Sequence, residues 1–304
     1  MGDAPAFTPD ELWAGGGFLE IDDHQRDPAS ASVIVIPAPF DGTSTWVKGA
    51  DQGPRAMIEA SQHLENYEPE GAWEPSDRGI ATHRGVETSG GLEGVVEGLE
   101  SLAGRALDAR LIPIALGGEH SVSIGPIRAA AARSDRLTVV QIDAHSDLRE
   151  SYHGSPLNHA CVMARAREVA DIVQIGLRSV SSEELATMAP ERTFWAHEIV
   201  DAPDDSWMAR VESLLGHDVY VTIDLDGLDP SIVPATGTPE PGGLRWGQVS
   251  RLLGRIAARS RIVGGDVVEL CPAPGHQASA QTGAKLTQRL ISCALMSQGL
   301  GPEA

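Results

Sequence analysis

The segment VVQIDAHSDLRE, residues 139–150, places Asp143, His145 and Asp147 at alternating positions directly after an apolar run. In an extended chain, alternate side chains point to the same side. Two carboxylates and an imidazole therefore converge where a strand ends, unless the segment is a polar turn with chance spacing. Such a convergence is typical of a site that binds something positively charged.

Three further apolar runs end in similar chemistry. His120 follows one run within GGEHS, Asp224 and Asp226 follow another within DLDGLDPS, and Glu269 lies in VVELCP. A lone histidine after a Gly-Gly turn is more often a hydrogen-bonded loop residue, and Asp-x-Asp before Asp-Pro also fits an Asx-type turn. The combination of these segments, rather than any one of them, indicates a site.

The predicted elements bring these segments together. Apolar runs rich in Val and Ile predict strands at 32–36, 112–116, 137–142, 171–175, 218–223 and 262–270. Helical periodicity predicts helices at 54–64, 92–110, 125–133, 182–188, 206–215 and 246–258. Strands that are apolar nearly throughout and separated by helices indicate a three-layer α/β/α sandwich with a central, mostly parallel sheet. In such sheets, sites lie beyond the carboxyl ends of the strands.

A metal centre follows from this placement. The shared edge of the sheet gathers two imidazoles and four carboxylates, namely His120, Asp143, His145, Asp147, Asp224 and Asp226. The carboxylates repel one another unless cations neutralise them. The set is too large for one tetrahedral zinc and suits two bridged ions, with Mn²⁺ favoured and Zn²⁺, Co²⁺ and Ni²⁺ left open. Metal-assisted hydrolysis is the reaction class that these residues support.

The bulk composition restricts the partners. The net charge of −20 over 304 residues argues against binding to nucleic acid or anionic membranes and suits a cationic substrate. No window approaches the roughly 18 apolar residues of a membrane helix, and the N-terminus lacks signal-peptide features. Three widely spaced cysteines, Cys161, Cys271 and Cys293, fit buried free thiols in a reducing cytoplasm.

Several motifs resemble the ureohydrolases, the arginase/agmatinase family. They are GGEHS (117–121), DAHSDLRE (143–150), SPLNHACVM (155–163), TIDLDGLDPSIVPATGTPEPGGL (222–244) and, in the early loop and first helix, PAPFDGTSTWVKGADQGPRAMIEAS (37–61). The resemblance extends from about residue 33 to 290 and implies one ureohydrolase domain over 1–304, with 1–31 as an N-terminal extension packed on it. It also implies a homo-oligomer, a trimer or a hexamer.

The resemblance assigns the metal ligands. It implies a dinuclear manganese centre in which His120 binds one ion and His145 the other. The remaining ligands are carboxylates, with Asp143 and Asp224 as bridges, Asp147 on the first ion and Asp226 on the second. A bridging hydroxide would attack the guanidinium carbon of the substrate.

The resemblance also assigns the acid–base residues. Asp147 would take up a proton on the way to the tetrahedral intermediate, and Glu269 would hold the guanidinium in a charge-assisted pair. His159 matches the mobile-loop histidine that shuttles protons to the departing amine, a role that suits its pKa. His153 is the competitor, but only His159 precedes a small residue and a short apolar run.

Two positions favour agmatine as the substrate. Arg149 stands where arginases typically have Asn, and Ser181 stands where they have the Asp that pairs with the α-ammonium of arginine. A site without that carboxylate should reject arginine. Agmatine would give putrescine and urea, whereas guanidinobutyrate, guanidinopropionate, arginine and guanidine remain alternatives. Arg149 either pairs with a substrate carboxylate or forms a structural ion pair.

Other features leave alternatives open. Glu65, Tyr67 and Glu68 are candidates to bind a terminal ammonium, or they form a solvated acidic turn. The segment Pro274–Gly275–His276 replaces a Tyr-Asp pair of many relatives and bears on specificity and assembly. A deacetylase-like amide hydrolase would use one zinc and tandem histidines, and a non-catalytic relative would have lost ligands. The complete ligand set argues against both.

Overall fold

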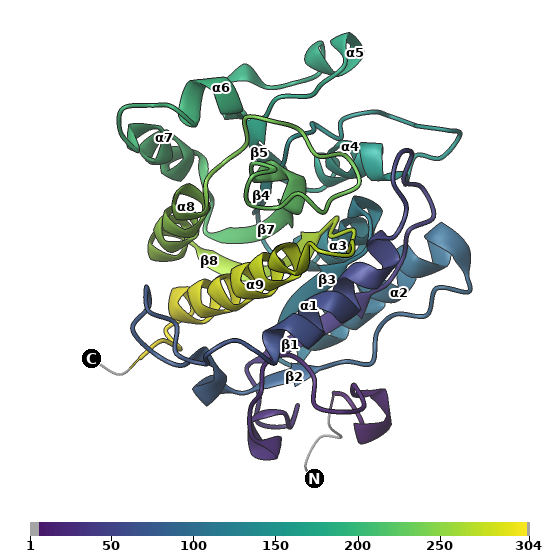
Figure 1. The fold of residues 1–304 in the computed structure, drawn as a ribbon, viewed down its shortest axis with the longest axis vertical. Helices are drawn as coiled ribbons and strands as arrows, with labels where there is room; N and C mark the ends of the chain where they lie inside the picture. Colours follow the sequence, from purple (N-terminus) through teal and green to yellow (C-terminus); the bar gives the residue numbers. More distant parts are fainter. Residues whose placement is uncertain (1–5, 303–304) are drawn as a thin grey trace.

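An eight-stranded parallel sheet forms the centre of the molecule (Figure 1). The computed structural model describes residues 6–302. The strand order is β2-β1-β3-β8-β7-β4-β5-β6. The bounds are β1 Val33–Ala38, β2 Ile80–Thr82, β3 Ile112–Gly117, β4 Leu137–Ile142, β5 Asp171–Leu177, β6 Thr193–Trp195, β7 Asp218–Asp224 and β8 Arg261–Val268.

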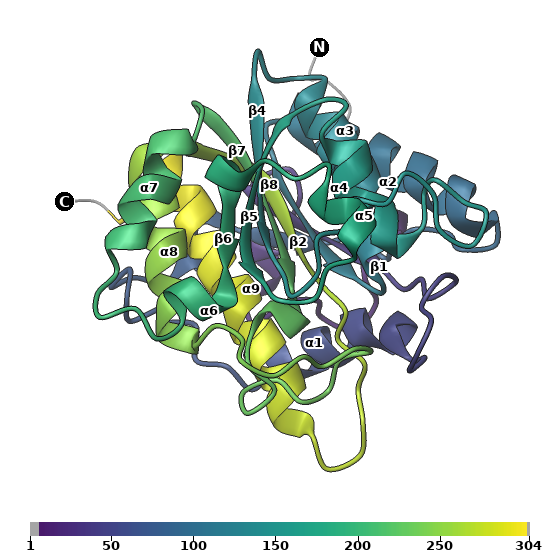
Figure 2. The same ribbon diagram turned by 90° about the horizontal axis from the view of Figure 1, so that it is seen from above.

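Helices cover both faces of the sheet, which confirms the predicted three-layer α/β/α sandwich (Figure 2). Helices α1, α8 and α9 pack together on one face, and α2, α3 and α4 pack on the other. The bounds are α1 Gly53–Ser61, α2 Gly91–Asp108, α3 Ile124–Ala131, α4 Val162–Ala166, α5 Ser182–Leu185, α6 Ala196–Ile199, α7 Ser206–Leu214, α8 Trp246–Arg259 and α9 Gln277–Ser297.

The central strands are buried on both faces. Every residue of β4 is buried, with Val140 and Ile142 in the cluster beneath α8 and α9, and Leu137 and Val139 in the cluster beneath α3 and α4. This alternation follows from the pleat of a strand. Each such side chain stabilises the fold by about 1.5–3 kcal/mol. The carboxyl ends of the strands are therefore held firmly in register.

All six predicted strands are present, and the elements that the sequence did not reveal have physical reasons. Strands β2 and β6 have three residues each and lie at the two edges of the sheet, so they carry too little pattern to detect. Helix α9 has 21 residues but buries polar side chains, including Thr287, Gln288 and Arg289, which obscure its periodicity. Helix α5 ends at Leu185, earlier than predicted.

The N-terminal segment contacts the sheet. Phe7 is buried in the cluster that contains Ile34 and Ile36, and the backbone N–H of Phe18 donates to Thr82 Oγ1 at 2.9 Å. Residues 1–5, on which part of the expected extension and of the leader prediction falls, lie outside the described residues. Among residues 6–302, no helix is both long and apolar enough to span a membrane. The three cysteines are free and buried, as predicted.

A buried ion pair fastens the segment 63–73 to α9. Arg289 Nη1 lies 2.9 Å from Glu68 Oε2, and both side chains are at most 7% exposed. Glu68 Oε2 also accepts from Ser292 Oγ at 3.0 Å and from the backbone N–H of Gly71 at 2.8 Å. Trp73 Nε1 donates to Ser292 Oγ at 2.9 Å. Glu68 is therefore committed to holding this segment.

Replacing one partner of that pair should destabilise the protein strongly. Arg289→Leu leaves the Glu68 carboxylate buried without its cation, a change that costs about 3–5 kcal/mol. Urea denaturation should show a much lower midpoint. Arg55→Leu is the matched control, because Arg55 pairs with Glu59 at the surface; an equal loss in both variants would contradict the assignment.

Candidate metal centre and active site

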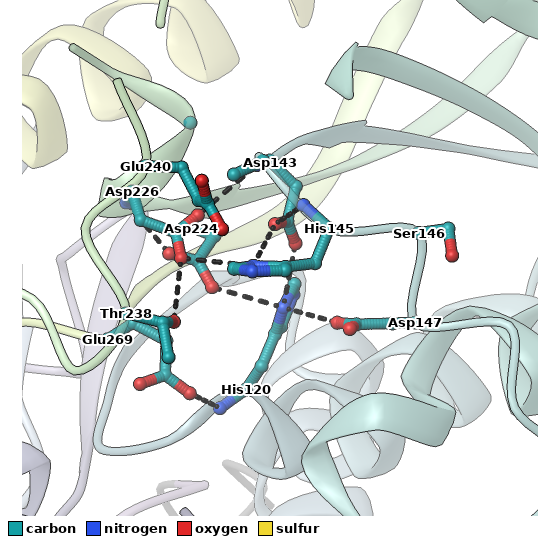
Figure 3. A network of polar contacts seen from close by, with 12 residues as sticks. His120, Asp143, His145, Ser146, Asp147, Asp224, Asp226, Thr238, Glu240 and Glu269 are labelled. Atoms are coloured by element: carbon teal, nitrogen blue, oxygen red, sulfur yellow. Dashed lines mark hydrogen bonds and ion pairs between the residues drawn. The ribbon is translucent and has the colours of Figure 1, made fainter. Parts of the chain in front are cut away.

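Four strand ends place the predicted site residues at one edge of the sheet. Ile142 pairs with Ile223, and Asp224 pairs with Val268, so the residues that follow β4, β7 and β8 are neighbours. Strand β3 pairs with β8 and leads into the segment with His120. Figure 3 shows the six predicted ligands turned toward one another together with Glu269.

His120 lies at the centre of the first group of ligands. Its Nδ1 atom is 2.9 Å from Asp147 Oδ2, 3.1 Å from Asp143 Oδ2 and 3.5 Å from Asp224 Oδ2. All four residues are buried. One ligand atom from each of His120, Asp143 and Asp147 lies within 4.8 Å of the others, a spacing that allows one cation to bind all three.

His145 forms a second group beside the first. Its Nδ1 atom is 3.1 Å from Asp226 Oδ2 and 3.7 Å from Asp143 Oδ1. Asp224 Oδ1 accepts the backbone N–H of Asp226 at 2.8 Å, which fixes these two carboxylates relative to each other. Asp143 belongs to both groups, so its two oxygens are placed to bridge two cations.

Several pKa values in this cluster are raised, because the crowded carboxylates favour bound protons or other cations. Burial raises the pKa of Asp224 well above its usual range, and the charges of Asp226 and Asp143 raise it further. Burial, with the nearby charge of Asp143, raises the pKa of Asp147 to about 6. Burial alone would lower the pKa of His145, but Asp226 and Asp143 raise it to about 12. The cluster binds protons tightly unless other cations neutralise it.

A hydrogen-bond chain fixes the tautomer of His120. Thr222 Oγ1 donates to Asp266 Oδ1 at 2.6 Å, so it accepts from His120 Nε2–H at 2.9 Å. Tyr220 donates its hydroxyl to the other oxygen of Asp266 at 2.7 Å. The buried Nδ1 of His120 makes no hydrogen bond within the described residues and turns its lone pair toward the carboxylates. The Nδ1 lone pair and the carboxylate oxygens are all acceptors, so a cation between them would satisfy them together. Metal-binding histidines are commonly oriented by a hydrogen bond at the other ring nitrogen, as His120 is here.

A cavity of about 330 Å³ opens over the cluster, within the range of small-molecule sites. Five of the six predicted ligands line it, whereas Asp143 lies beneath them. Further lining residues include Thr45, Arg149, Tyr152, His159, Ser181, Glu184, Thr238 and Glu269. The predicted catalytic residues therefore surround one cavity.

Glu269 is held in place by the segment that carries His120. Its Oε1 atom accepts the backbone N–H of His120 at 2.7 Å. Burial raises the pKa of Glu269 to about 8, with a contribution from the charge of Glu119. The backbone φ of Glu269 is 65° and that of Asp147 is 52°, values that non-glycine residues adopt at a cost and that concentrate at functional sites. A cationic ligand would favour the ionised form of Glu269.

The structure distinguishes the two candidate loop histidines. His159 lines the cavity, and its Nδ1 atom lies 2.9 Å from Thr43 Oγ1. Burial lowers the pKa of His159 to about 4, and positive charge on His120 and His145 contributes. His153 is exposed and stacks edge-on against Tyr152, outside the set of residues that line the cavity. Only His159 is placed to act on a ligand there.

Arg149, Glu184 and Ser181 occupy the outer wall of the cavity. Arg149 Nε lies 3.9 Å from Glu184 Oε2, and its guanidinium lies 4.8 Å from the centre of the Tyr152 ring. Ser181 Oγ donates to Glu184 Oε2 at 2.7 Å. Arg149 is thus already engaged by an acid and an aromatic ring, which agrees with the structural ion pair considered from the sequence.

The structure bears on two features that the sequence left open. Glu65, Tyr67 and Glu68 do not line the cavity, and Glu68 pairs with Arg289 instead. Pro274, Gly275 and His276 form an exposed loop before α9, away from the cavity lining. The residues that support the site were not predicted: Gln141 beside Asp143, Thr222 and Asp266 beside His120, and Thr43 and Glu119 beside His159. Asp266 could have been predicted from the sequence, because an acidic residue inside an apolar strand needs a hydrogen-bond partner.

Comparison with known proteins identifies the family and the fold of this chain. The model of the arginase family matches residues 31–293. The N(1)-aminopropylagmatine ureohydrolase of Synechocystis sp. is 38% identical over 276 residues, which cover 86% of this chain and 89% of that protein. The agmatinase of Pyrococcus horikoshii is 36% identical, with 86% and 91% covered. The crystal structure of the agmatine ureohydrolase of Thermoplasma volcanium superposes with a TM-score of 0.81 at 34% identity, with 89% and 92% covered.

The parallel sheet makes this an α/β protein, and two histidines and four aspartates lie together at the ends of its strands. Fold and site together indicate a class of α/β proteins with a carboxylate-rich cation site. The chain belongs to the arginase family. The resemblance noted from the motifs is thereby confirmed.

Removing the support of His120 should weaken metal binding. Thr222→Val deletes the hydroxyl that orients the imidazole, and loss of such a partner lowers metal affinity about 10–100-fold. Competition with a chelator, followed by metal analysis, measures the change. Thr138→Val removes a buried hydroxyl from the neighbouring strand β4, at its far end; that variant should bind metal normally, and equal losses would refute the role of Thr222.

Proposed function

We propose that this protein is a metal-dependent amidinohydrolase that cleaves a guanidino compound to urea and an amine. Agmatine, which yields putrescine and urea, is the substrate that we favour. The observation that carries the proposal is one cavity with the histidine–aspartate cluster at its floor and Glu269 and His159 on its walls. The relatives named agmatinase and aminopropylagmatine ureohydrolase support it.

The cluster would hold two divalent cations, of which Mn²⁺ suits the oxygen-rich ligands best. His120 and Asp147 would bind one ion, His145 and Asp226 the other, and Asp143 and Asp224 both. When bound, such a pair lowers the pKa of a water molecule and makes it a nucleophile at neutral pH.

The other roles fall to side chains around the cavity. Glu269 would pair with the guanidinium and hold its carbon over the cluster. Asp147 would take the proton that the attacking water loses, and His159 would give a proton to the departing amine. In the overall reaction, a guanidinium cation and water become urea and an alkylammonium ion, so charge and atoms balance.

The outer cavity supports a substrate without an α-amino acid group. Arg149 is paired with Glu184, and Ser181 offers no carboxylate to an α-ammonium. Aminopropylagmatine is the second candidate, because the relative with 38% identity bears that name. Both substrates carry a cationic tail, which suits a chain with a net charge of −20.

Assembly and location complete the proposal. We infer one ureohydrolase domain over 1–304, with residues 1–31 as an extension packed on it. The protein would work in the cytoplasm as a homo-oligomer, a trimer or a hexamer, on a small cationic substrate, without a nucleic-acid or membrane partner.

A urea-release assay with added Mn²⁺ tests the substrate. The value of kcat/KM for agmatine or aminopropylagmatine should exceed that for arginine at least about 100-fold, because the pocket lacks a partner for the α-ammonium. Guanidinobutyrate, guanidinopropionate and guanidine complete the panel.

His145→Ala and Asp224→Asn should lose both metal and turnover. Turnover by these variants after metal depletion, or a preference for arginine, would contradict the proposal.

A second assay tests the histidine of the loop. His159→Ala should lower kcat about 100–10,000-fold, the usual range of a general acid–base contribution, while the metal content stays unchanged. His153→Ala is the matched control and should keep normal turnover, since His153 does not line the cavity. The reverse pattern would transfer the role to His153.

A further inference from the structure

A chain of hydrogen bonds leads from Glu119 through Thr43 to His159 and joins three segments beside the cavity. Thr43 Oγ1 donates to Glu119 Oε1 at 2.6 Å. The same oxygen lies 2.9 Å from His159 Nδ1 and accepts the backbone N–H of His159 at 3.1 Å. One hydroxyl therefore connects the loop after β1, the end of β3 and the segment before α4.

The direction of these hydrogen bonds is fixed by their partners. Glu119 is fully buried and accepts from the backbone N–H groups of Thr43 and Ser44 and from Ser121 Oγ. Because these groups can only donate to it, Glu119 acts as an acceptor, and it accepts the hydrogen bond of the Thr43 hydroxyl. A hydroxyl has one proton and two acceptor positions. One acceptor position takes the backbone N–H of His159, and the other takes the Nδ1–H of its ring.

We propose that Thr43, oriented by Glu119, is a positioning residue that holds neutral His159 in the Nδ1–H tautomer and leaves its Nε2 lone pair free for proton transfer. This inference rests on the proposed function, because it supplies the partner of the histidine assigned there. Thr222 and Asp266 do the same for His120, with the opposite nitrogen protonated.

The proton transfer balances. Nε2 of the neutral ring first gains a proton from solvent, and Asp147 returns to solvent the proton that it took from the attacking water. The Nε2–H bond then breaks as a new N–H bond forms at the amine nitrogen. The C–N bond to the guanidinium carbon breaks at the same time, and its electron pair goes to that nitrogen. His159 returns to the neutral Nδ1–H form, in which the hydrogen bond to Thr43 is retained throughout.

Kinetics provide the first arm of the test. Thr43→Val keeps the shape of the side chain but removes the hydroxyl, and kcat should fall about 10–100-fold with KM changed less than about threefold. The metal content should stay unchanged, and Thr43→Ser should restore most of kcat. Thr282→Val, which removes a hydroxyl on α9, is the matched control. A normal kcat in Thr43→Val, or no rescue by Ser, would overturn the inference.

The second arm needs no turnover. Solid-state ¹⁵N spectra of histidine-labelled, Zn²⁺-loaded protein distinguish the two neutral tautomers, with His159→Gln to assign the signal. His159 should be protonated at Nδ1 in the wild type and in Thr43→Ser, and it should shift toward Nε2 protonation in Thr43→Val. An Nε2–H tautomer in the wild type, or no shift in Thr43→Val, would refute the inference. If the wild type released no urea and the tautomer still shifted in Thr43→Val, the proposed function would fail and the link from Thr43 to His159 would stand.

Discussion

Repulsion among four buried aspartates is the constraint on which the site depends. Asp143, Asp147, Asp224 and Asp226 lie at one sheet edge, and the only basic side chains that contact them among the described residues are two histidines. Like charges at such distances in a low dielectric destabilise one another by several kcal/mol. The fold tolerates this arrangement because a rigid parallel sheet, buried on both faces, holds the strand ends together. This repulsion favours cation binding, because the ligands are already assembled and a bound cation neutralises their charges.

The residues around the cluster keep it oriented. Gln141 donates to Asp143 at 2.7 Å and in turn accepts from Gln174 at 2.6 Å. Two threonines each donate a hydrogen bond to a buried carboxylate and accept one from an imidazole, Thr222 beside His120 and Thr43 beside His159. A neutral hydroxyl between the two charged or chargeable groups fixes the tautomer without adding another charge to a crowded site. The hydrogen bonds of the two threonines leave opposite ring nitrogens free, Nδ1 in His120 and Nε2 in His159.

The centre of the fold and the candidate ligands could be predicted from the sequence for the same reason. Long buried strands such as β4 and β7 carry a strong apolar pattern, and the acids that follow them stand out against it. The edge strands β2 and β6 and the polar helix α9 lack that contrast. Partners distant in the chain were also hidden, because Thr43 and His159 meet only after folding. Glu68 has the same limit: the sequence left a ligand contact and a solvated turn open, and its actual partner, Arg289, lies 221 positions further on.

Anomalous X-ray diffraction from crystals grown with Mn²⁺ tests the central claim most directly. The account predicts two anomalous peaks per chain, about 3.5–4 Å apart, with Asp143 and Asp224 between them and His120 and His145 on opposite sides. A single peak with tetrahedral ligands, or no peak among these side chains at saturating Mn²⁺, would contradict it.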